Sequence, residues 1–379
     1  MSIDRRQCVA GGLALALMPR GAHAQPRTVE ADIVVSDSRV TIGALINGKG
    51  PFSLIVDTGA QISGLRQGAV DALALKPRRD IRLGGRPFPL FAVDDLLLGG
   101  AVRQQGALFF GLGESAQLSG DGLVDAGIIT SVDSELLFEA QRWRVHLAGF
   151  SDTSRYGMAE ARLEPAKVAG LSARLFGRVG VGESTLDMVW DTGAHHALSI
   201  PASQARRLGL LDPAQVYAPV PSAGIHGLAR QPARLFAAPR IRVGEHVFEG
   251  LHGVIRMDDD TEGALILGYP VLRCLDLAIA RGGAFIGIRR NNLKPINPAY
   301  SLAGIWIDPA PNGVRVTEVG VGSPAAEAGL RPGDLITNLG DLPAALAKLR
   351  GDGAAELALI VRRQNQSEAL TLKFRDYLR

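Results

Sequence analysis

The chain has 379 residues, of which 46% are hydrophobic and 21% charged, so it is long enough for two or three domains that each bury a core. Its formal charge of +3 is close to balance and does not indicate a nucleic-acid-binding surface. Two cysteines in the whole chain exclude a disulfide-rich scaffold. We therefore expect a globular protein of several domains without a nucleic-acid partner.

Residues 1–24 are typical of an export signal. A pair of arginines at positions 5 and 6 precedes the apolar stretch 9–18, and the small-residue sequence Ala22-His23-Ala24 follows it. The arginine pair resembles that of a twin-arginine signal, although the residues after it depart from the usual pattern, so the export route stays open. We predict cleavage after Ala24 and a periplasmic or secreted protein.

Removal of residues 1–24 would change the net charge and the cysteine content of the chain. It would take away three arginines and one aspartate, so that the formal charge of +3 would fall by two. Cys274 would be the only cysteine left, which excludes an internal disulfide. The apolar stretch is shorter than the roughly 20 residues of a membrane-spanning helix, and no later segment is long enough, so we expect no stable membrane span.

A repeated pattern begins after the leader. Residues 39–60 predict a strand, an Asn47-Gly48 turn and a second strand that ends at the triplet Asp57-Thr58-Gly59. Residues 171–194 predict the same hairpin and end at the triplet Asp191-Thr192-Gly193. A short helix is expected next, from Pro201 to Gly209.

The repeat continues beyond the triplets. Residues 120–147 and 261–288 each contain an acid and a glycine, an apolar pair, a helical turn and a closing hairpin. The sequence therefore predicts one mostly β unit of about a hundred residues that occurs twice.

The doubled triplet and its surroundings resemble the pepsin and retropepsin families of aspartic proteases over roughly residues 28–290. The resemblance implies a mostly β fold of two pseudo-symmetric lobes, lobe 1 at 25–150 and lobe 2 at 151–290. It also implies that each lobe supplies one half of a catalytic dyad. The implied site residues are the acids Asp57 and Asp191 and their supports Thr58, Gly59, Thr192 and Gly193.

The chemistry of peptide hydrolysis independently favours two paired acids. One group must take a proton from water while another protonates the carbonyl oxygen or the departing nitrogen. Two carboxyl groups about 3 Å apart, as in the aspartic proteases, cannot both ionise, so one is the acid and the other the base. Such an enzyme needs no metal and no organic cofactor, and we predict none.

Three alternatives are open. Each triplet could be a turn that closes a strand, but the apolar run before each acid indicates a buried strand. The chain could form a homodimer that pairs Asp57 with its copy, but the triplet at Asp191 favours a monomer with an intramolecular pair. It could also be an inactive peptide-binding protein with the protease fold, because lobe 1 has Asp125 where lobe 2 has Gly268. An acid there would disturb the backbone or add a third carboxylate.

Two glycine-containing hairpins are candidate flaps over the substrate, although ordinary surface hairpins would look the same. Their predicted substrate-binding residues are Gly84, Gly85, Gly224 and His226. His195 and His196 follow the second triplet but have no acid or histidine at metal-ligand spacing. We therefore expect these two histidines to be exposed or packing residues.

A second resemblance begins after the polar linker 291–300, which contains two prolines. Residues 301–379 include the run 323–334, SPAAEAGLRPGD, and resemble a PDZ domain. Such domains add a peptide terminus to a strand and hold its carboxylate with backbone amides. A PDZ fold that only packs against the protease is the alternative. The implied carboxylate loop is Leu302, Ala303, Gly304 and Ile305.

Together these observations predict an exported aspartic endopeptidase with a PDZ module. The expected partners are peptide or protein substrates and, for the PDZ domain, the carboxyl terminus of a peptide.

Overall fold

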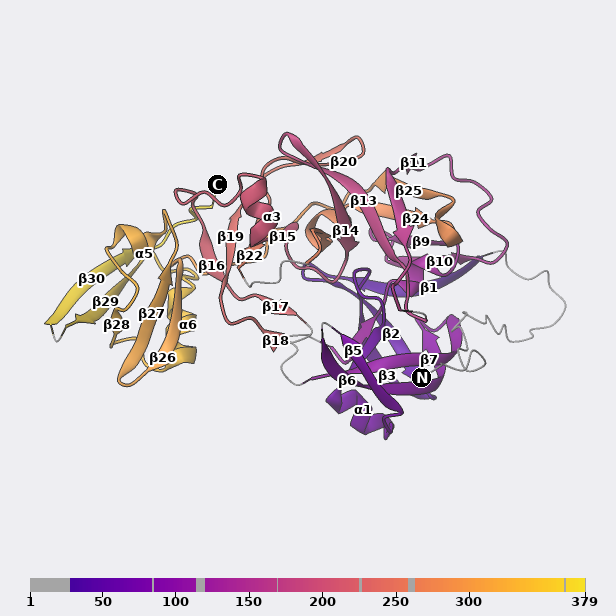
Figure 1. Cartoon of the computed structure of the whole chain (residues 1–379), viewed down its shortest axis with the longest axis horizontal. Coiled ribbons are helices and arrows are strands. Elements are labelled where there is room, and N and C mark those ends of the chain that lie inside the picture. Colours follow the sequence, from indigo (N-terminus) through magenta and orange to yellow (C-terminus); the bar gives the residue numbers. More distant parts are fainter. Residues whose placement is uncertain are drawn as a thin grey trace.

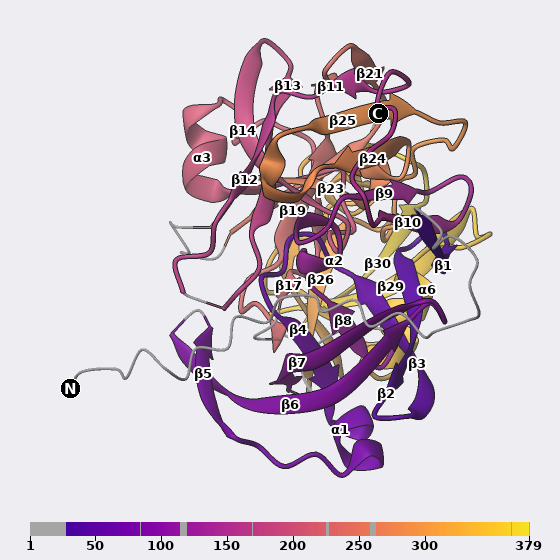
Figure 2. The same cartoon turned by 90° about the vertical axis from the view of Figure 1, so that its right-hand side faces the viewer.

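The computed structural model describes residues 28–83, 85–113, 120–168, 170–224, 227–257, 263–364 and 366–378. The predicted export signal, residues 1–24, lies outside these ranges, as do Gly84 and His226. Within them the chain is mostly β, as predicted, with short helices between the strands (Figure 1, Figure 2).

Lobe 1 is built around the predicted hairpin of β2 and β3. Asn47 and Gly48 have φ angles of 50° and 75°, which is the geometry of a tight two-residue hairpin turn. The end of β3 is buried, and Asp57 directly follows its last residue, Val56. The elements of lobe 1 are β1 (Thr28–Val35), β2 (Val40–Ile46), β3 (Lys49–Val56), β4 (Ser63–Arg66), α1 (Gln67–Leu73), β5 (Arg79–Leu83), β6 (Arg86–Leu98), β7 (Val102–Leu112), β8 (Gly122–Val124), α2 (Gly127–Thr130), β9 (Ser134–Leu137) and β10 (Arg142–His146).

Lobe 2 repeats this plan. The hairpin of β13 and β14 turns at Gly182, whose φ is 57°, and Asp191 is the last residue of β14. The predicted helix is α3, which begins after Pro201 and ends before Gly209. The elements of lobe 2 are β11 (Gly157–Met158), β12 (Ala161–Glu164), β13 (Arg174–Val181), β14 (Ser184–Asp191), β15 (Leu198–Pro201), α3 (Ala202–Arg207), β16 (Ala218–Val220), β17 (Ala223–Gly224), β18 (Gly227–Leu228), β19 (Ala233–Ala237), β20 (Ile241–Val243), β21 (His246–Phe248), β22 (His252–Arg256), β23 (Ile266–Gly268), α4 (Tyr269–Leu272), β24 (Leu275–Ile279) and β25 (Ile286–Arg290).

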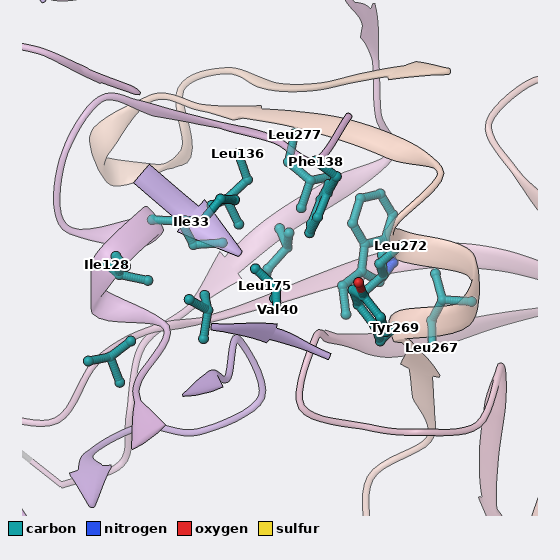
Figure 3. Packing of buried hydrophobic residues seen from close by; sticks show 14 of the residues in the cluster. Ile33, Val40, Ile128, Leu136, Phe138, Leu175, Leu267, Tyr269, Leu272 and Leu277 are labelled. Carbon is teal, nitrogen blue, oxygen red and sulfur yellow. The ribbon is translucent and has the colours of Figure 1, made fainter. Parts of the chain in front are cut away.

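The closing hairpins of the two lobes form one shared sheet, in the order β11-β25-β24-β9-β10-β1. Its centre is the antiparallel pair of β9 from lobe 1 and β24 from lobe 2, with Leu136 opposite Leu277. All residues of both strands are buried, as in strands covered on both faces. Figure 3 shows Phe138 of lobe 1 and Tyr269 of lobe 2 in the same core, with ring centroids 6.4 Å apart. The lobes are therefore joined by a continuous hydrophobic core.

The C-terminal region forms a separate five-stranded sheet in the order β26-β27-β28-β29-β30, with its own apolar core. In Figure 1 it lies beside β16 of lobe 2, at the end of the molecule away from lobe 1. Its elements are β26 (Ile305–Ala310), β27 (Gly313–Val319), α5 (Pro324–Glu327), β28 (Leu335–Ile336), α6 (Leu342–Leu349), β29 (Glu356–Arg363) and β30 (Gln366–Lys373).

The segment after β30 attaches this region to lobe 2. Tyr377 and Leu378 pack in one apolar cluster with Ala233 and Val254 of lobe 2. The Nε2 atom of His252 lies 3.2 Å from the carbonyl oxygen of Leu378. The C-terminal region is thus held against strands β19 and β22.

No helix in the described part of the chain has the length and apolar character needed to cross a bilayer.

Candidate active site

The two triplets meet at the centre of the interface between the lobes. The N–H of Thr58 donates to Oγ1 of Thr192 at 3.2 Å, and the N–H of Thr192 donates to Oγ1 of Thr58 at 3.0 Å. Each hydroxyl in turn donates to a backbone carbonyl of the opposite lobe, Thr58 to Trp190 and Thr192 to Val56. Both threonines are buried, so these bonds are shielded from water and fix the two loops relative to each other.

The glycines of the triplets leave room for the acids of the opposite lobe. A Cβ atom on Gly59 would lie 2.4 Å from Cγ of Asp191, and one on Gly193 would lie 2.7 Å from Cγ of Asp57. No other residue type fits at these two positions, because the only neighbours that could shift are the carboxyl groups themselves. The glycines therefore allow the carboxyl groups to come together.

This contact leads to a testable prediction. Gly193→Ala is expected to lower the turnover of peptide substrates by about a hundredfold, because the new methyl group displaces the Asp57 carboxyl from its place. The control is Gly68→Ala in α1, where a Cβ atom has no heavy atom within 4 Å. Turnover and melting temperature are measured for both variants. Normal turnover of Gly193→Ala would contradict the close contact between Gly193 and the Asp57 carboxyl.

Burial raises the pKa of both carboxyl groups. The pKa of Asp57 is raised well above its ordinary value by burial, by the negative charge of Asp191 and by the hydrogen bond between the two side chains. Burial also raises the pKa of Asp191, but the N–H of Gly193 and the hydrogen bond with Asp57 oppose this rise. The arrangement favours one proton shared by the pair.

Asp125 and Gly268 occupy equivalent places in the two lobes. Asp125 directly follows β8, the parallel neighbour of β3, and Gly268 ends β23, the parallel neighbour of β14. A Cβ atom on Gly268 would lie 2.0 Å from the carbonyl oxygen of His196, so lobe 2 requires glycine here. Lobe 1 accommodates a side chain at the same place.

The carboxylate of Asp125 has its own hydrogen-bond donors. It accepts from Oγ of Ser63 at 3.0 Å, from Oγ of Ser172 at 2.7 Å and from the N–H of Gly127 at 2.7 Å. Asp125 lines a cavity with Gln61 and Ser172, apart from the cavity that contains Asp57 and Asp191. The cross-bonds between Thr58 and Thr192 are formed in its presence.

A cavity of about 360 Å³ opens beside the two carboxyl groups, mainly on the side of lobe 2. Its walls combine apolar side chains with a small set of polar ones, as is usual for ligand sites. The polar residues along it are His195, His196, Ser199, Ser222 and Arg256, in addition to Asp57 and Asp191.

His195 and His196 are partly buried and both line this cavity. Nε2 of His195 lies 3.2 Å from Nη2 of Arg39, and burial, followed by the charge of Arg39, lowers the pKa of His195. Burial, followed by the nearby His195 and His252, lowers the pKa of His196 to about 4. The only feature of the sequence that indicates that His195 and His196 line the cavity is their position directly after the triplet. Among the described residues, no three His, Cys, Asp or Glu side chains are grouped so as to hold a metal ion.

The two candidate flaps are hairpins in the structure. Gly85, with a φ of 79°, lies in the turn between β5 and β6 of lobe 1. Gly224 lies in the hairpin of β17 and β18, and it lines the cavity beside the dyad, whereas Gly85 does not. Figure 1 shows both hairpins on the same side of the gap between the lobes. Gly84 and His226 lie outside the described residues.

The predicted carboxylate loop of the C-terminal region directly precedes and begins β26. The N–H groups of Leu302, Ala303 and Gly304 each donate to a backbone carbonyl of the same region, at 3.2 Å. Ile305 begins β26 and pairs with Val319 of β27. A carboxylate would bind to these amides only after they leave their present partners.

Two lobes that each bring an Asp-Thr-Gly triplet to one interface define an aspartic protease fold. Residues 177–271 match the aspartyl protease family, and residues 315–363 match the PDZ domain family. The protein therefore combines a retropepsin-like aspartyl protease domain with a C-terminal PDZ domain, as predicted from the sequence. No curated protein matches the chain. The match to the aspartyl protease family lies in lobe 2, and lobe 1 is related to lobe 2 by the structural repeat.

Proposed function

We propose that the protein is an aspartic endopeptidase that hydrolyses peptide bonds with Asp57 and Asp191. The observation that carries the proposal is the pair of half-buried carboxyl groups at the interface, where each acid lies against the glycine of the other triplet. Both acids belong to one chain, which supports an intramolecular dyad in a monomer over a homodimer.

The two carboxyl groups divide the proton transfers between them. Asp191, ionised, takes a proton from a water molecule, whose oxygen then attacks the carbonyl carbon of the peptide. Asp57, protonated, donates its proton to the carbonyl oxygen, and a tetrahedral diol results. The C–N bond then breaks as Asp191 passes its proton to the nitrogen and Asp57 regains a proton from a diol hydroxyl. An acid and an amine are released, and the pair keeps one proton.

The function is tested on the purified protein without residues 1–24, with a mixed library of peptides. We expect the protein to cleave these peptides. We also expect a statine-type transition-state inhibitor to block the cleavage, because the inhibitor's hydroxyl occupies the place of the attacking water. Binding of peptides without cleavage would instead support the alternative of an inactive peptide-binding protein.

We also propose that the protein is exported to the periplasm or secreted. This rests on the arginine pair, the apolar stretch 9–18 and the cleavage sequence that ends at Ala24. The test is the amino-terminal sequence of the protein recovered from a bacterial periplasm, which is expected to begin at Gln25.

The PDZ domain carries a second proposed function, the binding of a peptide carboxyl terminus at Leu302 to Ile305. A peptide with a free terminus is expected to bind at least about tenfold more tightly than its amidated form, because the amide lacks the negative charge that the loop would hold. Calorimetric titration of both peptides measures this difference. Equal affinities would show that the amides of the loop keep their present carbonyl partners.

The pH dependence gives a further prediction. Ala60 and Ala194 follow the two glycines, and alanine has no hydroxyl that could donate to a carboxylate. The raised pKa of Asp57 therefore keeps the shared proton to higher pH, and we expect optimal activity in the weakly acidic range. Replacing both alanines with serine is expected to shift the pH profile of kcat/KM downward by about one unit, because a hydroxyl donor stabilises the ionised form.

The matching control is Asp125→Gly, because a nearby negative charge also raises the pKa values of the dyad. The profile of this variant shows how much Asp125 contributes to the position of the optimum. A strongly acidic optimum of the wild type, unchanged in the double serine variant and in Asp125→Gly, would contradict the prediction.

A further inference from the structure

The C-terminal region contacts lobe 2 at Tyr217, the residue before β16 (Figure 1). The hydroxyl of Tyr217 donates to Oε1 of Glu318 at 2.8 Å, and its N–H donates to the carbonyl oxygen of Val321 at 3.3 Å. Arg234 of β19 lies over the ring of Tyr217 at 4.4 Å and approaches Glu318 to 3.5 Å. One end of the antiparallel pair β16 and β19 is thus bonded to β27 and to the residues that follow β27.

The other end of the same strand pair forms a wall of the cavity beside the dyad. Pro221 and Ser222 directly follow β16, and both line this cavity. Ala233, the first residue of β19, lines it as well and pairs with Val220. Tyr217 and Pro221 therefore flank one short strand, with the C-terminal region at one end and the dyad cavity at the other.

The predicted carboxylate loop also contacts Tyr217, through two neighbours. The carbonyl oxygen of Gly304 accepts from the N–H of Gly320 at 2.8 Å, and a Cβ atom on Gly320 would lie 2.1 Å from the carbonyl oxygen of Tyr217. A Cβ atom on Gly304 would lie 2.4 Å from the hydroxyl of Tyr377, which is 3.5 Å from the same carbonyl oxygen. A movement of Gly304 therefore affects both residues that pack on Tyr217.

Binding of a carboxylate requires such a movement. The N–H groups of Leu302, Ala303 and Gly304 now donate to backbone carbonyls and must turn away from them. Gly304 takes part in both sets of bonds, because its N–H must turn toward the carboxylate while its carbonyl oxygen accepts from Gly320. A ligand shifts an equilibrium only when it binds one arrangement better than the other, and a carboxylate binds only the arrangement with free amides.

On the basis of the proposed peptidase and PDZ functions, we propose that a peptide carboxyl terminus bound at the loop loosens the contact with Tyr217 and thereby weakens ligand binding at the dyad. The cavity wall at Pro221 and Ser222 is then less ordered, and a substrate must order it. When one ligand loosens what another must order, the two oppose each other. Each hydrolysed bond releases a new carboxyl terminus, so the PDZ domain senses the products and slows the reaction.

Amide hydrogen exchange tests the loosening without catalysis. We expect the N–H groups of Tyr217 and Gly320 to exchange at least about fivefold faster when a short peptide that ends in a free leucine carboxylate is bound, because both donate within the contact. The amidated form of the peptide should leave their exchange unchanged. Unchanged exchange with the free-terminus peptide bound would overturn the proposal.

The affinity of a statine-type inhibitor measures the coupling to the dyad. We expect its Kd to rise at least about fivefold in the presence of saturating free-terminus peptide, and the Kd of the peptide to rise by the same factor when the inhibitor is bound. An unchanged Kd of the inhibitor overturns the coupling and leaves the peptidase. A protein that binds the peptide but not the inhibitor contradicts the peptidase, and a protein that binds the inhibitor but not the peptide contradicts the PDZ function; either result also overturns the feedback.

Two variants test the path through Tyr217. Tyr217→Phe removes the hydrogen bond to Glu318, and Gly320→Ala places a methyl group against the carbonyl of Tyr217. Each is expected to weaken inhibitor binding without any peptide and to reduce the effect of the peptide to less than about twofold. Thr317→Val is the matched control, because the exposed Thr317 hydroxyl donates to the carbonyl of Trp306 within the C-terminal region, and it should keep the full effect. A full peptide effect in both test variants, with melting temperatures close to that of wild type, would overturn this path.

Discussion

Asp191→Asn is expected to lower kcat/KM for peptide hydrolysis by at least about a thousandfold while the protein stays folded. An amide cannot take a proton from water, and it cannot share one with Asp57. The fold should persist, because the amide oxygen still accepts from the N–H of Gly193, 2.7 Å away, and the threonine cross-bonds do not involve the changed group. Asp57→Asn is expected to give a similar loss.

The comparison variant is Asp125→Asn, which changes a neighbouring acid outside the pair. Its carboxylate bonds to two serines and one backbone N–H, so we expect activity within a few fold of wild type. Turnover and thermal unfolding are measured for all three variants. Activity of Asp191→Asn close to that of wild type would exclude the intramolecular pair.

The largest expected effect on stability is at Glu135, in the central strand β9 of the shared sheet. Its side chain is fully buried and accepts from Arg144 at 2.9 Å and from the hydroxyl of Tyr156 at 2.6 Å, and it also pairs with Arg155. Glu135→Leu leaves these donors without their acceptor, and we expect it to lower the free energy of unfolding by about 3–5 kcal/mol. Urea denaturation measures the change.

An exposed pair provides the control for this experiment. Asp32 and Arg142 approach to 2.8 Å, with 78% and 42% of their side chains exposed, so Asp32→Leu should cost less than about 1 kcal/mol. A loss of similar size in Glu135→Leu and Asp32→Leu would show that the buried network does not stabilise the sheet.

Glu135 also predicts how stability depends on pH. Burial alone would raise its pKa, but the hydrogen bonds from Tyr156, Arg155 and His146 outweigh burial and lower the pKa from 4.5 to about 2. Because the folded state has the lower pKa, this stabilisation is complete above pH 4.5 and is lost as the pH falls toward 2. The difference in unfolding free energy between wild type and Glu135→Leu should shrink over that range.

Local features of the sequence were enough to predict the hairpins and the dyad. Asn47-Gly48 specifies its turn within two residues, and the apolar runs before Asp57 and Asp191 indicate strands that end in the core. The resemblance then supplied the pairing of the triplets, which the threonine cross-bonds show directly.

The remaining features depend on contacts between residues far apart in the chain. The sequence predicts a closing hairpin at β9 and β10, but it does not identify β24 as the neighbour of β9. His196 was not predicted to line the cavity, because its neighbours there come from β15, β22 and the hairpin of β17 and β18. The packing of Tyr377 against lobe 2 likewise has no local signal.

The presence of both cross-bonded threonines in one chain has a consequence for how this protein can change over generations. An enzyme assembled from two identical chains must place the same residue on both sides of the scissile bond, so any substitution there is made twice. In this protein the two halves are covalently fused, and a substitution affects one side only. Asp125 and Gly268 are equivalent positions that carry different residues, and only lobe 1 has room for a side chain there. Fusion of the halves therefore allows the two sides of the proposed active site to differ.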